Sequence, residues 1–210
     1  SGVGKTELCK ALSEALFGTE DALIRVDMSE YSEEATASRL IGSPPGYVGY
    51  GDGGQLTDAV LKRPYSVVLF DEIEKAHPKI FSLLLQLLDD GQLTDSVGRK
   101  VNFKNTVVIM TSNTGVSFEM DKRLGFSGSK TDDTPTISRR RTIMAQAKQT
   151  FRPEFLGRID EMIVMNSLTQ EDGTKIAELM LEKVKARLEQ QGIMLSYDQE
   201  VPVLLAQSGV

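Results

Sequence analysis

Four short apolar runs, separated by segments with helical periodicity, are the feature that most constrains the fold of this chain. The runs span residues 22–26, 66–70, 106–110 and 162–165. None of them alternates apolar with polar residues, and short continuous runs of this kind are typical of strands buried on both faces of a parallel sheet. Helical patterns lie between them, such as residues 7–17 and the segment that begins at Pro78. The sequence therefore predicts a three-layer α/β/α fold around a parallel sheet.

The end of the chain predicts a second, smaller lobe. Thr169 is a capping residue at the start of a long amphipathic helix, and Gly192 lies just past its end. The apolar stripe of this helix consists of Ile176, Leu179, Met180, Val184 and Leu188. We expect a strand over residues 193–197 and a helical turn over 203–207 to follow. This divides the chain into a large α/β subdomain, residues 1–166, and a small, mainly helical α+β subdomain, residues 167–210, both truncated.

Composition argues against several classes of function. The chain has 24 basic and 30 acidic residues, and its net charge of −6 argues against duplex nucleic acid as the main partner. No apolar run is long enough to span a membrane, and the first residues are not a secretory signal. Cys9 is the single cysteine, so the fold needs no disulfide and a reducing compartment is expected. We expect a cytoplasmic protein, with an organelle stroma as the open alternative.

The first residues contain most of a phosphate-binding loop. They match the last six positions of the G-x-x-x-x-G-K-[ST] motif and lack its first glycine. In such a loop the glycines bring backbone N–H groups close to phosphate oxygens, the lysine reaches the β- and γ-phosphates, and the hydroxyl binds Mg²⁺. An ordinary glycine turn before a helix is the alternative. The candidate nucleotide-binding residues are Ser1, Gly2, Val3, Gly4, Lys5, Thr6 and Glu7.

A second motif follows the apolar run 66–70, which leads directly into Asp71 and Glu72. A carboxylate at the carboxyl edge of a parallel strand can hold the Mg²⁺ of a bound nucleotide, so Thr6 and Asp71 are expected to share the metal, partly through water. Glu72 is then placed to orient and deprotonate the water that attacks the γ-phosphate. The alternative is an acidic strand end that simply faces solvent, which the order of the two motifs disfavours.

A third candidate residue follows the apolar run 106–110. This run ends in Thr111-Ser112-Asn113, and an amide at such a strand edge can hydrogen-bond the attacking water or a γ-phosphate oxygen. Asparagine is also a common turn former. The residues alone leave both interpretations of Asn113 open.

Five long stretches resemble a known family. They are RVDMSEY (25–31), SRLIGSPPGYVGYGDGGQLTDAV (38–60), KRPYSVVLFDEIEKAHP (62–78), LLLQLLDDGQLTDSVGRKVNFKNTVVIMTSN (83–113) and FRPEFLGRIDE (151–161). They resemble the second ATPase module of the two-ring Clp unfoldases of the AAA+ class, and most of all the ClpC type. The resemblance implies an AAA+ P-loop fold, ATP and Mg²⁺ as cofactors and a homo-hexameric ring. It also implies the roles given above to Lys5, Thr6, Asp71, Glu72 and Asn113.

The resemblance also assigns a role to Arg158. It implies that Arg158 reaches the γ-phosphate held by a neighbouring subunit, as an arginine finger. Taken from the residues alone, Arg158 follows Pro153 and Gly157 in a short polar connection, where a surface salt bridge is the ordinary expectation. Relatives usually carry asparagine where this chain has Gly157, which bears on the geometry of the finger.

Three loops are implied to contact polypeptides. In the family, an aromatic residue between glycines, here Tyr47 followed by Val48, grips a substrate chain in the central pore. A second pore loop is expected over residues 94–100, with Arg99 and Lys100 as contacts. Leu124, Gly125 and Phe126 correspond to a tripeptide that docks on the ClpP peptidase ring, the alternative being a small local apolar cluster.

These features together predict an ATP-dependent protein unfoldase that threads polypeptides through a hexameric pore, delivers them to ClpP and is not itself a peptidase. Adaptor proteins would bind regions that precede this chain. A ClpB-like disaggregase that works without a protease is the main alternative. A nucleic-acid motor on the same fold is disfavoured by the acidic composition, and a non-catalytic scaffold by the intact Lys5, Asp71, Glu72 and Arg158.

Overall fold

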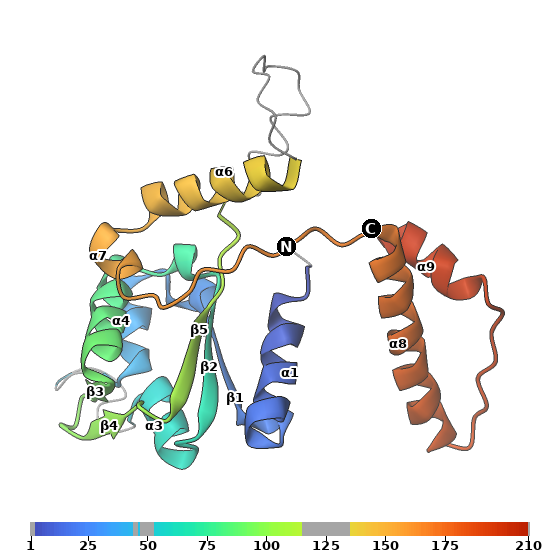
Figure 1. The fold of residues 1–210 in the computed structure, drawn as a ribbon. Helices are drawn as coiled ribbons and strands as arrows, with labels where there is room; N and C mark the ends of the chain where they lie inside the picture. The colour runs from blue at the N-terminus through green and yellow to red at the C-terminus, as the bar shows by residue number, and fades with distance from the viewer. Residues whose placement is uncertain (1–2, 44–45, 47–52, 115–134, 210) are drawn as a thin grey trace. The chain divides into compact units, whose positions relative to one another are not determined.

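The computed structural model describes residues 3–43, 46, 53–114 and 135–209 (Figure 1). The chain divides into two compact units, residues 1–164 and 165–210, each of which is described here by itself. No helix among the described residues is both long enough and apolar enough to cross a membrane.

The first unit is built on a three-stranded parallel sheet in the order β1-β2-β5. The strands are β1 (Leu23–Asp27), β2 (Ser66–Asp71) and β5 (Thr106–Met110). The central strand β2 is buried along its whole length, which agrees with its unbroken apolar sequence. The register pairs Asp27 with Asp71, so the carboxyl ends of β1 and β2 lie level with each other. Three of the four predicted strands are thus confirmed.

The fourth predicted strand, residues 162–165, is wrong. This segment is irregular and pairs with no described strand. Its apolar residues are typical of a buried strand. A strand also needs a neighbouring strand whose backbone completes its hydrogen bonds.

Helices lie on both sides of the sheet. Figure 1 shows α1 on one side and α3 and α4 on the other. The helices of the first unit are α1 (Lys5–Phe17), α2 (Glu34–Ala37), α3 (Gln55–Lys62), α4 (Pro78–Asp90), α6 (Pro135–Thr150) and α7 (Pro153–Leu156). The described part of this unit also has four short 3₁₀ turns between its helices and strands: η1 (Glu20–Ala22), η2 (Met28–Tyr31), η3 (Ser38–Leu40) and η4 (Ile73–Lys75). The predicted three-layer α/β/α arrangement is confirmed.

The sequence explains where the main helices begin and end. Gly4 and Gly18 flank α1, and both adopt left-handed φ values, 82° and 76°, that glycine tolerates without strain. Pro78 occupies the first turn of α4, where its missing N–H costs nothing, and the His77 side chain accepts a hydrogen bond from the Lys79 N–H. Gly91 ends α4 in the left-handed conformation.

The core of the first unit lies between the sheet and α3 and α4. Leu56 and Val60 from α3 and Ile80, Leu84 and Leu87 from α4 pack against Val68 and Phe70 of β2. An aromatic cluster fastens α7 to α4, because the Phe81 ring lies 5.2 Å from Phe155 and 6.0 Å from Phe151, centroid to centroid. This cluster holds the segment that carries Arg158.

A β-hairpin follows α4. Its strands, β3 (Gln92–Thr94) and β4 (Lys100–Asn102), are antiparallel, and they bury Leu93 and Val101 against the core. The predicted second pore loop, residues 94–100, lies within this hairpin and includes the turn that joins β3 to β4.

The second unit consists of two described helices, α8 (Gln170–Glu189) and α9 (Val201–Gly209), which pack against each other. The predicted strand over 193–197 is wrong, since this segment is irregular. The long helix is confirmed, but Leu179 and Met180 of its apolar stripe remain 66% and 64% exposed. The residues that α8 buries are Gly173 and Ala177, so close approach to α9 depends on small side chains.

The start of α8 has a complete capping box. The Thr169 hydroxyl accepts a hydrogen bond from the Asp172 N–H (3.2 Å), and the Asp172 carboxylate accepts from the Thr169 N–H (2.9 Å) and hydroxyl (2.7 Å). These hydrogen bonds lower the pKa of Asp172. The cap therefore satisfies N–H groups that the first turn of a helix leaves without partners.

We expect Thr169→Ala to destabilise the first turn of α8 by about 1 kcal/mol, because a cap hydroxyl is lost. Amide hydrogen exchange at residues 170–173 should then become about fivefold faster, measured by mass spectrometry or NMR. Thr169→Ser is the matched control and should exchange like the natural protein. Equal exchange in both variants would contradict the role of the cap.

Candidate functional site

The start of α1 brings a phosphate-loop lysine to the end of β5. The Lys5 ammonium donates to the Ser112 carbonyl at 2.8 Å and to Asn113 Oδ1 at 2.6 Å. Gly4, in the left-handed conformation, turns the chain into the helix just before Lys5. Val3 and Gly4 are described, whereas Ser1 and Gly2 lie outside the described residues. The sequence analysis predicted Lys5 and Asn113 separately, and the structure joins them by a hydrogen bond.

Asp71 and Thr6 lie together at the carboxyl end of the central strand. The Thr6 hydroxyl lies 3.5 Å from Asp71 Oδ2, and the Thr111 hydroxyl donates to Asp71 Oδ1 at 2.5 Å. Asp71 is buried, with 7% of its surface exposed. Burial, with the Asp71 charge as a second cause, raises the pKa of the nearby Cys9 thiol, so this cysteine remains protonated and unreactive at neutral pH.

The residues present fit a magnesium–nucleotide site. Mg²⁺ prefers oxygen ligands and is usually held by one or two carboxylates or hydroxyls together with substrate phosphates. Thr6 and Asp71 supply a hydroxyl and a carboxylate, and Lys5 adds a cation for phosphate. No group of three or more His, Cys, Asp or Glu side chains among the described residues could hold a metal ion by itself. The donor set therefore suits a metal that arrives with a nucleotide.

Glu72 is held in an unusual backbone conformation. It is the only non-glycine residue with positive φ in the described part of the chain, at 57°. Asn113 Nδ2 donates to Glu72 Oε1 at 2.8 Å, and the Lys75 ammonium forms an ion pair with Glu72 Oε2. Such a conformation costs about 1–3 kcal/mol and persists at functional sites where the surroundings enforce it. Both carboxylate oxygens of Glu72 are thus engaged.

Asn113 connects Lys5, at the start of α1, with Glu72, which follows β2. Its side-chain oxygen accepts from Lys5, its side-chain nitrogen donates to Glu72, and its backbone N–H donates to Glu74 Oε1 at 2.9 Å. A simple turn residue would not need three polar partners from two other segments. These contacts place Asn113 among the polar residues at the sheet edge, and its functional role stays a prediction.

Arg25 is a residue of the site that no sequence motif indicated. From β1, its Nε and Nη2 donate to Asp71 Oδ2 at 3.1 and 2.7 Å. The sequence did contain a sign of this role, because Arg25 is a cation within an otherwise apolar run. Arg25 and Asp27 are two residues apart, so their side chains lie on the same face of β1, and the register pairs Asp27 with Asp71. Lys75, three residues after Glu72, was likewise not indicated by a motif.

Arg158 lies on another part of the first unit. Its Nε forms an ion pair with Asp89 near the end of α4, and its Nη1 donates to the Glu154 carbonyl at 2.8 Å. The hydrogen bond that Arg158 donates to Asp89 raises the pKa of Arg158. The structure brings Arg158 into a surface salt bridge and not to Lys5, Asp71 or Glu72 of its own chain. Its action across a subunit boundary stays a prediction.

Arg99 holds the tip of the β3–β4 hairpin in place. Its Nε donates to Asp95 Oδ2 at 2.5 Å and its Nη2 to Asp58 Oδ1 of α3 at 2.7 Å. The Ser96 N–H also donates to the Ile41 carbonyl at 2.9 Å. Arg99 is therefore occupied within its own chain, and its contact with a substrate, like that of exposed Lys100, stays a prediction. Tyr47, Val48, Leu124, Gly125 and Phe126 lie outside the described residues.

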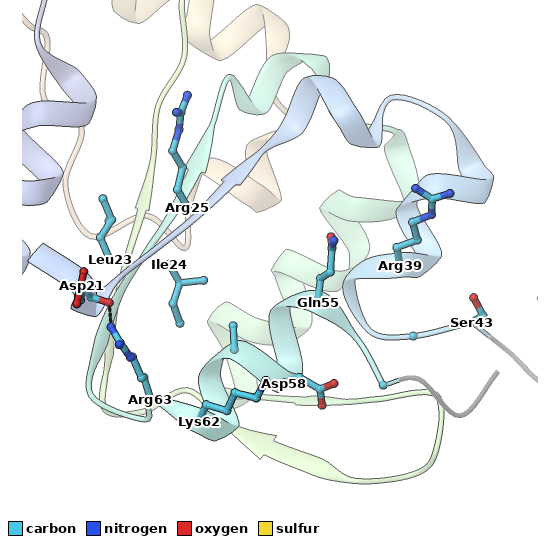
Figure 2. A pocket seen from close by; sticks show the side chains of 13 residues that line it. Asp21, Leu23, Ile24, Arg25, Arg39, Ser43, Gln55, Asp58, Lys62 and Arg63 are labelled. Carbon is cyan, nitrogen blue, oxygen red and sulfur yellow. Dashed lines mark hydrogen bonds between the residues drawn. The ribbon is translucent and has the colours of Figure 1, made fainter. Parts of the chain in front are cut away.

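A recess of about 790 Å³ lies beside β1 and α3 (Figure 2). It is lined by Asp21, Leu23, Ile24, Arg25, Arg39, Gly42, Ser43, Gly53, Gln55, Asp58, Ala59, Lys62 and Arg63. None of Lys5, Thr6, Asp71 or Glu72 borders it. Arg25 is shared, because it lines the recess and also contacts Asp71. In Figure 2 its side chain points away from Lys62 and Arg63.

Comparison with known families now assigns the chain. Residues 1–162 match the family described as AAA domain (Cdc48 subfamily). The chain belongs to this AAA family. Residues 168–210 match the C-terminal D2-small domain of ClpB protein. Membership in the AAA family implies nucleotide binding, in agreement with the hydrogen-bonded group formed by Lys5, Asp71, Glu72 and Asn113.

Individual relatives support this assignment. The chain is 51% identical over 209 residues to a protein of Staphylococcus saprophyticus named ATP-dependent Clp protease ATP-binding subunit ClpC, and 54% identical over 213 residues to a ClpA homolog of Cyanidium caldarium. Both matches cover 100% of this chain but only 26% and 25% of those proteins. The chain thus spans about a quarter of the length of these relatives.

A solved structure gives the same result. The chain superposes on a closed-state reconstruction of Hsp104 with ATPγS and FITC casein with a TM-score of 0.82 and 43% sequence identity. The match covers 100% of this chain and 35% of the Hsp104 chain. The resemblance to the second ATPase module of the Clp unfoldases is therefore confirmed.

The Asp95–Arg99 contact makes the stability of the hairpin dependent on pH. Burial by itself would raise the pKa of Asp95, but hydrogen bonds from the Arg99 side chain and from the backbone N–H groups of Arg99 and Val97 outweigh it and lower the pKa. A carboxyl group with a lowered pKa stabilises the folded state above its unfolded pKa, and this contribution is lost as pH falls through the folded pKa.

We expect Asp95→Asn to lower the free energy of unfolding at pH 7 by about 1–3 kcal/mol, since a charge-assisted hydrogen bond inside the protein is lost. The difference from the natural protein should shrink as pH falls below about 4, the ordinary pKa of aspartate. Urea unfolding at pH 7 and pH 3.5 measures it. A difference that stays constant with pH would exclude the charge as its cause.

Proposed function

We propose that this chain is the ATP-hydrolysing module of a protein unfoldase. The observation that carries the proposal is a hydrogen-bonded group at the carboxyl edge of the sheet, in which Asn113 binds both Lys5 and Glu72. The Thr6–Asp71 pair lies beside this group. In a parallel α/β sheet this edge is where ligands bind. The family assignment and the Clp names of the relatives support ATP as the ligand.

Each residue of the site has a separate role in the proposed phosphoryl transfer. Lys5 binds the β- and γ-phosphate oxygens as a point charge, and Thr6 and Asp71 hold the magnesium ion, partly through water. When bound, Mg²⁺ neutralises charge that develops on the phosphate oxygens. Glu72 accepts the proton of the attacking water, and Asn113 orients that water or a γ-phosphate oxygen. Each Glu72 oxygen accepts one hydrogen bond, from Asn113 or from Lys75, and so keeps a second lone-pair direction for the attacking water.

The remaining assignments concern the assembled protein. We propose a homo-hexamer in which Arg158 reaches a neighbour's γ-phosphate, and a pore in which Tyr47 and Val48 grip a polypeptide, with Arg99 and Lys100 nearby. Adaptor proteins would bind parts of the full-length protein that precede this chain. The salt bridge from Arg158 to Asp89 is exposed, so it can be exchanged for a phosphate at little cost.

Glu72→Gln should separate nucleotide binding from hydrolysis. In the full-length protein we expect the affinity for a fluorescent ATP analogue to stay within about twofold, while the hydrolysis rate falls by about 10²–10⁴, the usual contribution of a general base. The variant should also retain bound unfolded polypeptide. Glu34→Gln is the control, because Glu34 is an exposed partner of Lys79. Substantial hydrolysis by Glu72→Gln would refute the assigned role.

Two outcomes for the threaded polypeptide remain to be distinguished. Delivery to ClpP is supported by the ClpC and ClpA names of relatives and by the tripeptide Leu124-Gly125-Phe126. A disaggregase without a protease is supported by the match of residues 168–210 to the ClpB small domain and by the similarity to Hsp104. We favour ClpP delivery, because Leu124 and Phe126 are large apolar residues within a polar, turn-rich stretch of the sequence, and a docking partner would explain this pattern.

Phe126→Ala tests this choice directly. We expect the full-length protein to sediment with ClpP in the presence of ATPγS, and the variant to lose this association at least tenfold while its ATPase rate is unchanged, because only an apolar anchor is removed. Met194→Ala is the control, since Met194 is an apolar side chain that is 93% exposed elsewhere. Absence of co-sedimentation of the natural protein would favour the disaggregase.

A further inference from the structure

Asp71 has one oxygen that faces the proposed metal position. Its Oδ1 accepts a hydrogen bond from the Thr111 hydroxyl, which lies on the side of β5. Its Oδ2 faces the hydroxyl of Thr6 at 3.5 Å. Since Thr6 and Asp71 are proposed to share the metal, Oδ2 is the oxygen that would accept a hydrogen bond from a metal-bound water.

Arg25 already occupies this oxygen. Nε and Nη2 of Arg25 both donate to Asp71 Oδ2, at 3.1 and 2.7 Å. A carboxylate oxygen offers about two lone-pair directions, and the two short N–H donors of Arg25 take these up, while the Thr6 hydroxyl makes only a longer contact of 3.5 Å. The carboxylate side chain is only 10% exposed, which makes a charge-assisted pair of this kind strong. A metal-bound water can therefore bind Oδ2 only if Arg25 gives up at least one hydrogen bond.

A second acceptor lies within reach of the same guanidinium. Nη2 of Arg25 is 3.9 Å from Asp27 Oδ2, and hydrogen bonds from Ser29 lower the pKa of Asp27, so this carboxylate is ionised at neutral pH. The Arg25 side chain is half-exposed. It has both the space and a charged partner to move to.

We propose that Arg25 is a positioning residue for the metal site: its guanidinium holds and neutralises Asp71 Oδ2, and it moves to Asp27 when a metal-bound water takes that oxygen. The inference rests on the proposed Mg²⁺–nucleotide site and adds a device that sets the magnesium concentration at which the site fills. The guanidinium competes with the metal for one carboxylate oxygen, so its removal makes Mg²⁺ binding tighter, and loss of its second partner makes Mg²⁺ binding weaker.

The test is a titration of Mg²⁺ against the binding of fluorescent ADP by the full-length protein, which requires no hydrolysis. We expect Arg25→Met to lower the midpoint Mg²⁺ concentration by about three- to tenfold, because the competing cation is absent. Asp27→Asn should raise the midpoint, since Arg25 then has no charged alternative to Asp71. Arg25→Lys keeps the charge without the fork and should fall between Arg25→Met and the natural protein.

Arg39→Met is the matched control. Arg39 lines the same recess, and it forms no hydrogen bond or ion pair with Asp71 within the described part of the chain. This variant removes the same charge and should leave the midpoint unchanged. Binding of ADP in EDTA should be equal in all variants, which reports that the phosphate loop is intact.

The outcomes are distinguishable. If Arg25→Met has the midpoint of Arg39→Met, or a higher one than the natural protein, Arg25 does not compete with the metal and the inference is overturned while the proposed function stands. If nucleotide binding by the natural protein does not depend on Mg²⁺ at all, the proposed function fails and the inference fails with it.

Discussion

The structure depends on the burial of a charged carboxylate, that of Asp71, at the end of strand β2. All residues of β2 are buried, and its last residue, Asp71, remains 7% exposed. A carboxylate in such a place is strongly destabilising unless cations and hydrogen bonds compensate it. The compensation comes from the start of α1 through Thr6, from β1 through Arg25 and from the segment after β5 through Thr111. The need to satisfy one charge thus brings three distant segments to one edge of the sheet.

The same constraint explains how the site could respond to its ligand. Lys5, Asn113, Glu72 and Lys75 form a continuous chain of polar contacts, so the phosphate that we propose for this site would change the partners of Asn113 and Glu72 if it drew Lys5 away. Glu72 is held in a left-handed backbone conformation, which fixes the direction of its side chain before any ligand arrives. A network of this kind would allow partners to be exchanged, as the nucleotide-hydrolysing site that we propose requires.

Local patterns in the sequence predicted much of the fold. Contacts between segments that are distant in the sequence could not be predicted in this way. Three apolar runs became strands, and helices begin at the predicted cap Thr169 and at the predicted first-turn proline Pro78 as their chemistry dictates. The runs at 162–165 and 193–197 had similar composition but found no strand partner, because hydrogen-bond pairing is a property of two segments. Arg99 shows the same limit, since a cation in a loop gives no sign that Asp58 of α3 will lie beside it.

The amino-acid sequence by itself determined the alternation of strands and helices, the candidate phosphate-loop residues Lys5 and Thr6, and the acidic strand end at Asp71 and Glu72, because periodicity and short motifs depend only on neighbours along the chain. Only the tertiary structure decided that Asn113 joins Lys5 to Glu72 and that Arg25 rests on Asp71. These pairings depend on the register of parallel strands and on side-chain reach across the sheet edge, which arise when segments tens of residues apart are packed together.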